Sequence, residues 1–177
     1  MEILDVISAI AEEQGLNFLL IGGHAVNAYG EGRQTGDIDF LVKQKDREGW
    51  KNLILSLRYK LYHEHKAFIQ FSAPQLGMWP IDLMLVEDET FTKMSSLSWN
   101  ADFGGRYAIR VPTVQHLIAL KLHAVKQSDR DDKLKDLRDI IQLTKIKELD
   151  ILGDDFKALC IKYGSKEVYD KICEYGK

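Results

Sequence analysis

The sequence predicts an α+β fold with an α/β-type core, in which helices flank a mixed β-sheet and a C-terminal helical cap follows. Three observations predict it. Helix and strand patterns alternate from the start of the chain to about residue 58, further short strand patterns extend to residue 111, and from Pro112 the pattern is only helical. The 177 residues, 45% of them hydrophobic, suffice for one domain with a substantial core. We expect an α/β-type core over residues 1–111 and a helical region over 112–177 packed on it as one compact unit.

The first elements follow from the spacing of apolar residues. Ile3, Leu4, Ile7 and Ile10 lie at helical spacing and predict a helix over residues 2–14. The apolar run over 17–21 predicts a buried strand, residues 24–29 a short helix, and the alternating acidic and apolar residues over 37–42 a second strand. Residues 30–36 have the composition of a loop.

The later elements are assigned in the same way. Trp50 and Leu53 belong to an inward stripe that predicts a helix. Residues 87–103 are polar and show no clear period. The remaining predicted elements are a helix over 46–58, strands over 59–64, 67–72, 81–86 and 107–111, helices over 114–127 and 130–145, and two shorter helices separated at Gly164.

Composition excludes several classes of protein. No apolar run approaches the roughly 18–20 residues of a membrane-spanning helix, and no basic region followed by an apolar stretch begins the chain, so we expect neither a membrane protein nor a secreted one. Cys160 and Cys173 lack the spacing of a zinc or disulfide framework, which favours a reducing cytoplasm. The formal net charge of −3 argues against a protein that coats nucleic acid by bulk positive charge.

Charge is distributed in blocks along the chain. Residues 43–66 carry seven basic residues against three acidic ones, whereas residues 82–102 carry five acidic residues against one basic one. Such alternation suits a site where carboxylates and cations converge, and it is also common on the surfaces of ordinary folds.

Three carboxylates are the main chemical feature. Asp37 and Asp39 are two apart in a predicted strand, so both project from the same face. An isolated pair of this kind is more often a solvated strand edge, but Phe40, Leu41 and Val42 make this a core strand, where two acids need a cation. Asp82 lies alone in the apolar strand 81–86 and also needs a partner or a metal. Carboxylates are ligands of Mg²⁺, so these residues predict a magnesium site.

Other residues extend the site toward phosphate. Gly22 and Gly23 end the first buried strand and would let backbone N–H groups approach a phosphate closely. Arg33 and Thr35 lie in the loop that follows and could add phosphate contacts. Lys121 stands in the middle of an apolar helical run, where it either extends outward to solvent or serves an acidic site.

These motifs together resemble a known superfamily. The run GGHAVNAYGEGRQTGDIDFLV, with IDLMLV about forty residues later, resembles the nucleotidyltransferase superfamily of DNA polymerase β-like fold. Within it, the sequence is most similar to the AbiEii-type abortive-infection and minimal nucleotidyltransferases, and the segment VPTVQHLIALKLHAVKQSDRDDKLKDLRDI is similar to their helical region. The resemblance covers residues 18–141.

The resemblance implies a role for each matching residue. It makes Asp37, Asp39 and Asp82 the catalytic metal ligands, with Asp82 assisting deprotonation of the acceptor. It makes Gly22 and Gly23 the phosphate turn, and Lys121 and Lys135, the latter followed by Asp136, triphosphate ligands. Many relatives have serine where this chain has Gly23, and residue 24 varies among them where this chain has His24, so the detail of triphosphate binding differs here.

The implied activity is transfer of a nucleoside monophosphate from an NTP to an acceptor, with two Mg²⁺ ions. The acceptor expected of a toxin-like member is tRNA or a protein, in a toxin–antitoxin or abortive-infection system that includes a cognate antitoxin. Two alternatives stay open at this point. One is nucleotidyl transfer to a small molecule such as an aminoglycoside or lincosamide antibiotic, and the other is a non-catalytic binding partner that keeps the fold.

Overall fold

The computed structural model describes residues 2–30, 32–126 and 133–176. Within them the chain forms two compact units. The sheet unit comprises residues 1–28 and 32–113, and the helical unit comprises residues 29–31 and 114–177. The predicted boundary at residue 111 remains a prediction about domain organisation. No helix in the described ranges is both long and apolar enough to cross a membrane.

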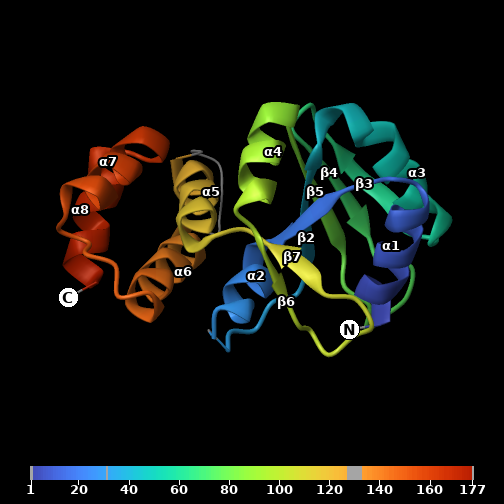
Figure 1. Cartoon of the computed structure of the whole chain (residues 1–177), viewed down its shortest axis with the longest axis horizontal. Helices are drawn as coiled ribbons and strands as arrows, with labels where there is room; N and C mark the ends of the chain where they lie inside the picture. The colour runs from blue at the N-terminus through green and yellow to red at the C-terminus, as the bar shows by residue number, and fades with distance from the viewer. Residues whose placement is uncertain (1, 31, 127–132, 177) are drawn as a thin grey trace. The chain divides into compact units, whose positions relative to one another are not determined.

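The sheet unit contains a five-stranded mixed sheet with helices on both faces (Figure 1). The strands are ordered β1-β2-β5-β4-β3, and β2 and β5 are parallel while the other neighbouring strands are antiparallel. A separate hairpin, β6-β7, completes this unit. Its elements are α1 (Glu2–Glu13), β1 (Phe18–Ile21), α2 (Gly22–Ala28), β2 (Ile38–Lys43), a 3₁₀ turn (Gln44–Asp46), α3 (Arg47–Ser56), β3 (Lys60–Glu64), β4 (Phe68–Ser72), β5 (Ile81–Val86), α4 (Asp88–Ser96), β6 (Trp99–Ala101) and β7 (Ile109–Val111).

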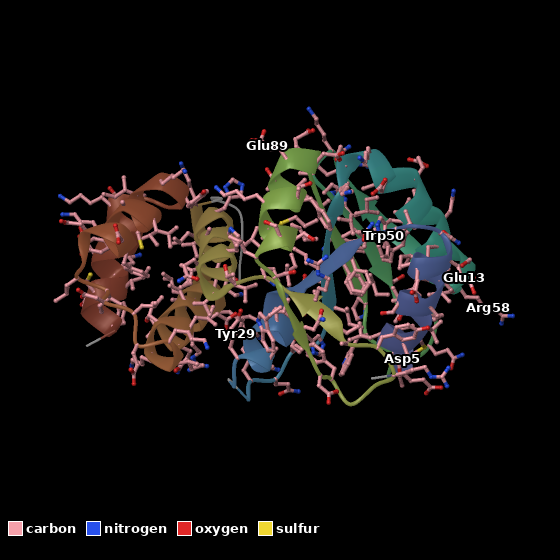
Figure 2. The ribbon with its side chains drawn as sticks, viewed as in Figure 1. Asp5, Glu13, Tyr29, Trp50, Arg58 and Glu89 are labelled. Carbon is pink, nitrogen blue, oxygen red and sulfur yellow. The ribbon has the colours of Figure 1, made fainter. Side chains whose placement is uncertain are left out.

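Alternation along β2 decides which helix covers which face. The Phe40 ring stacks at 6.1 Å on that of Trp50, a fully buried residue of α3, and α3 in turn contacts α1. Lys43 is three residues from Phe40, so its side chain lies on the opposite face of the sheet. Its ammonium is 5.2 Å from the ring centroid of Phe91 in α4. In Figure 2 Trp50 lies among the ribbons, whereas the Glu89 side chain of α4 points away from them. Thus α1 and α3 cover one face, and α4 covers the face that carries Asp39.

The helical unit consists of α5 (Val114–Lys126), α6 (Lys133–Ile146), α7 (Asp154–Tyr163) and α8 (Lys166–Tyr175). Apolar side chains of α5 and α6, including Ile118, Leu122 and Ile140, are fully buried. The Ser165 hydroxyl caps α8 by accepting a hydrogen bond from the Val168 N–H. The first residues of the helix predicted over 130–145 lie outside the described residues.

The mixed α+β architecture with a helical C-terminal region is confirmed. Two elements were not predicted: α4 and β6 lie in the polar stretch 87–103. Several boundaries also differ by one to three residues. Two of them matter for the site: α2 begins at Gly22 itself, and β2 begins at Ile38, one residue later than expected. Ile38 is the residue whose N–H bonds to the Pro80 carbonyl, so Asp37 stands just before the strand ladder.

Candidate active site

Asp39 and Asp82 are neighbours across the two parallel strands. Their Cα atoms are register partners in the β2-β5 pair, so both side chains project from the same face of the sheet. Both residues are half-buried, between fully buried apolar neighbours. Parallel pairing puts the first residues of both strands at one edge of the sheet, and this edge is where the candidate site lies.

The Asp82 carboxylate is oriented from the third strand along. Gln70 of β4 is its register partner, and the Gln70 side-chain amide donates a 2.7 Å hydrogen bond to Asp82 Oδ2. The amide donor carries no formal charge. Gln70 therefore fixes the orientation of Asp82 without neutralising it.

Asp37 is held from its own loop. The Thr35 hydroxyl donates a 3.0 Å hydrogen bond to Asp37 Oδ1. The loop itself is clamped by Asn27 of α2, whose side-chain amide donates to the Arg33 carbonyl at 2.8 Å and accepts from the Arg33 N–H at 3.1 Å. Asp39 is therefore positioned by the sheet, whereas Asp37 is positioned by the loop that precedes β2.

The glycine pair allows these groups to converge on the start of α2. A Cβ built on Gly22 would stand 2.5 Å from Asp39 Cγ and closer still to Oδ2. A Cβ built on Gly23 would stand 2.5 Å from Thr35 Oγ1 and 2.6 Å from Arg33 Nη2. Gly22 also has φ of +63°, a conformation that favours glycine. The pair therefore lets Asp39, Thr35 and Arg33 pack against this turn.

His24, the next residue of α2, is a buried part of the same edge. Its ring lies 4.9 Å from that of Trp79, and its Nε2 atom has no hydrogen-bond partner among the described residues. Burial lowers the pKa of His24 below its usual 6.5, Asp37 opposes this shift, and Arg33 adds to it. The imidazole beside the carboxylates is therefore neutral near pH 7.

Lys121 and Lys135 belong to the helical unit. Lys121 is buried, and its ammonium lies 3.1 Å from Asp136 Oδ1 and 2.5 Å from Asp139 Oδ2, both buried acids of α6. Lys135 is half-buried on α6. Of the two possibilities for Lys121, extension to solvent is wrong, and the ammonium serves an acidic cluster within its own unit. The triphosphate roles expected of both lysines remain predictions.

The carboxylates at this edge fit a magnesium ion that also takes ligands from its substrate. Among the described residues no three His, Cys, Asp or Glu side chains form a ready-made metal cluster. Mg²⁺, however, is usually held by one or two carboxylates, by waters and by substrate phosphates, and not by a closed protein cage. The in-register acids Asp39 and Asp82 supply such carboxylates at an open edge. The residues therefore fit an ion whose other ligands come from a nucleotide.

Sequence reasoning missed four residues that shape these clusters. They are Asn27, Gln70, the buried His24 as a neighbour of Asp37, and Asp139 as a partner of Lys121. Asp139 follows Asp136 by three residues, so helical periodicity alone could have placed both on one face. Gln70 becomes identifiable only once β4 is paired with β5.

Four of the seven basic residues in the block over 43–66 make contacts within the sheet unit. Arg47 and Lys51 both form ion pairs with Glu64, at 2.8 and 2.7 Å, and Lys45 pairs with Asp88. The Lys43 ammonium lies over Phe91. The block therefore presents less uncompensated charge than its composition suggests.

A family model described as "Nucleotidyl transferase AbiEii toxin, Type IV TA system" matches residues 5–172. No curated protein sequence matches the chain.

Solved structures of nucleotidyltransferases share the fold. The solution structure of the antibiotic-resistance factor ANT(2'')-Ia aligns with a TM-score of 0.64 at 15% identity, over 98% of this chain and 96% of that one. The lincosamide antibiotic adenylyltransferase LnuA, bound to lincomycin, aligns with a TM-score of 0.52 at 17% identity, over 81% and 95%. A putative nucleotidyltransferase from Thermotoga maritima aligns with a TM-score of 0.52 at 15% identity, over 80% and 91%. These alignments confirm the expected fold.

Proposed function

We propose that this chain, which belongs to the AbiEii nucleotidyl transferase toxin family, transfers a nucleoside monophosphate from an NTP to an acceptor at the sheet edge formed by Asp37, Asp39 and Asp82. Family membership makes the chain a nucleotidyltransferase. The observation that carries the assignment of the site is the register pairing of Asp39 with Asp82 on adjacent parallel strands.

Magnesium is the cofactor that these acids suit, and we assign Asp37, Asp39 and Asp82 to two Mg²⁺ ions. When bound, such ions neutralise charge on the reacting phosphates and stabilise the attacking and leaving oxygens. Thr35 orients Asp37, and Gln70 orients Asp82. The two carboxylates are therefore already oriented before the substrate binds, which lowers the entropic cost of the reaction.

The chain's own groups divide the reaction between them. An acceptor oxygen forms a bond to the α-phosphorus of the NTP, the bond from that phosphorus to the pyrophosphate oxygen breaks, and Asp82 receives the acceptor proton. Arg33, whose guanidinium lies against Gly23, is placed to balance charge on the departing pyrophosphate. Lys121 and Lys135 are the further cations that we assign to the triphosphate.

We propose a toxin-like role with tRNA or a protein as the acceptor, and a cognate antitoxin as a partner. The description of the family supports this choice. A basic surface favours an RNA acceptor. Lys45, Arg47 and Lys51 of the block over 43–66 are engaged in ion pairs, so the block gives this acceptor little support. A small antitoxin gene beside this one would add support. A cytoplasmic location remains a prediction from the cysteine pattern.

The decisive experiment replaces the paired acids. Asp39→Asn and Asp82→Asn should each reduce Mg²⁺-dependent transfer of labelled NMP by at least about 100-fold, since a bound metal contributes several kcal/mol to the transition state. Glu89→Gln, an exposed acid-to-amide change on α4, is the matched control and should retain activity. Each of the four NTPs is offered with tRNA, total protein, an aminoglycoside and lincomycin as acceptors.

The outcomes separate the two levels of the proposal. Transfer to an antibiotic alone would overturn the toxin-like role but keep the activity. Full activity of both Asn variants would overturn the assignment of the site. If the intact protein transfers no label to any of these acceptors, the catalytic proposal fails.

A further inference from the structure

A cavity of about 540 Å³ opens in the sheet unit beside the first two turns of α1. Its wall includes Ile3 and Val6 of α1, Tyr59 immediately before β3, and Met78 and Trp79 in the segment between β4 and β5. Small-molecule sites typically measure about 300–1,000 Å³ and are mostly apolar with a few polar groups. The size and composition of this cavity are therefore those of a ligand site.

The apolar part of the wall is reachable from solvent. Trp79 and Met78 are each 36% exposed and Val6 is 40% exposed, although all three are large apolar residues. An indole face that remains accessible in a concave wall offers a flat surface for stacking, and its π-electrons also attract a cation. The wall therefore favours a planar ring.

One charged group narrows the class of ligand. Tyr59 is only 2% exposed and its hydroxyl has no accessible surface, so this oxygen is out of a ligand's reach. Among the described lining residues Glu2 alone carries a charge, and it is exposed at the rim. A positive group on the ligand is therefore favoured over a negative one.

The cavity lies at the same sheet edge as the carboxylates but is not built from them. Tyr59 precedes β3, which is separated from β5 by β4, so it is about 10 Å from the β5 axis at about 4.8 Å per strand. The cavity and the carboxylates are connected through Trp79, whose ring contacts that of His24. None of the residues assigned above to the metal or to phosphate lines the cavity.

We propose that this cavity binds a planar, amine-bearing small molecule, whose ring stacks on Trp79 and whose ammonium faces Glu2. The inference does not depend on nucleotidyl transfer, because none of its groups takes part in that reaction.

Three naphthalenes that share one ring and differ in charge test the proposal. They are 1-naphthylmethylamine, 1-naphthalenemethanol and 1-naphthoate, titrated into the full chain and followed by calorimetry and by ligand-observed NMR. The amine should bind at least ten-fold more tightly than the carboxylate. Equal binding of the amine and the carboxylate, or no binding of the amine at millimolar concentration, would overturn the proposal.

Variants locate the binding. Trp79→Ala should weaken binding of the amine at least ten-fold, whereas Trp99→Ala, which removes a comparably exposed indole from β6, should leave it unchanged. Glu2→Gln should reduce the affinity of the amine to that of the alcohol. Glu2 is exposed, so its variant tests the charge preference even if Trp79→Ala does not fold. Equal binding by Trp79→Ala and Trp99→Ala would place the ligand elsewhere and overturn the proposal.

Discussion

The Asp39 carboxylate occupies the space in which a side chain at Gly22 would stand. Residue 22 begins α2, and Asp39 lies in the strand paired with β1, whose last residue, Ile21, is the register partner of Asp39. The glycine therefore fixes how closely a candidate catalytic acid approaches the turn between β1 and α2. Both the conformation of residue 22 and the space beside it exclude a larger residue.

Gly22→Ala should destabilise the protein by about 3 kcal/mol or more. A left-handed conformation costs a residue with a Cβ about 1–2 kcal/mol, and overpacking adds about 1–3 kcal/mol. Gly15→Ala is the matched control, because Gly15 has φ of +66° and a methyl group added there would meet nothing within 4 Å. Urea unfolding of both variants separates the two contributions. Equal losses in the two variants would contradict the close approach of Asp39.

Gly23→Ala should lower the free energy of unfolding, because the added methyl group displaces Thr35 and Arg33. The same displacement should reduce transfer activity. The Cβ would meet Thr35 Oγ1 at 2.5 Å and Thr35 Cβ at 2.8 Å. Removing the Thr35 side chain in the same protein should recover part of the lost stability, because the double variant relieves the overlap. The measurement is a double-mutant cycle with Thr35→Gly, followed by urea unfolding. Strictly additive losses would argue against this contact.

The free energy of unfolding should decrease as the pH falls below about 6.5, partly because His24 becomes protonated. Its pKa in the folded protein lies below 6.5 because of burial, so the unfolded chain binds the proton more readily. The contribution of His24 is therefore complete above pH 6.5 and is lost as the pH falls toward its lower folded pKa. His24→Asn should show a smaller decrease in unfolding free energy over this interval. The same slope in both proteins would contradict the prediction.

Lys121→Met should destabilise the protein by about 3–5 kcal/mol, because it removes the ammonium that pairs with the buried acids Asp136 and Asp139. Lys126→Met, an exposed lysine at the end of the same helix, should change stability by less than about 0.5 kcal/mol. Thermal and urea unfolding measure both changes. Adding Asp136→Asn and Asp139→Asn to Lys121→Met should restore much of the loss. A change as small as that of Lys126→Met would show that the cluster is not structural.

The sequence predicted the strands and the long helices well because their apolar periods are clear. It did not predict α4, because only Phe91 and Met94 of that helix are buried and two apolar positions do not define a period. The three acids could be selected from sequence, since acids in apolar strands are conspicuous. Their supports could not, because Gln70 and Asp139 become partners only through tertiary pairing.

The glycine pair illustrates the same limit. The sequence marks residues 22 and 23 as a place where a phosphate approaches the backbone, and that role stays a prediction. It does not show which of the chain's own groups lie beside the two glycines. In the structure the groups are the chain's own, Asp39 at one glycine and Thr35 with Arg33 at the other. The phosphate role that we propose for the turn therefore has to accommodate these side chains, of which Arg33 is the cation.

The parallel pairing of β2 with β5 determines how a misfolded form of this protein could be detected. Side chains alternate between faces, so a slip of one residue would set Asp39 opposite Ile81 or Leu83 and turn Asp82 toward the helices on the other face. Such a misaligned sheet would retain nearly all its secondary structure while separating the two acids. For this protein, catalytic turnover would thus be a more sensitive gauge of correct strand alignment than circular dichroism.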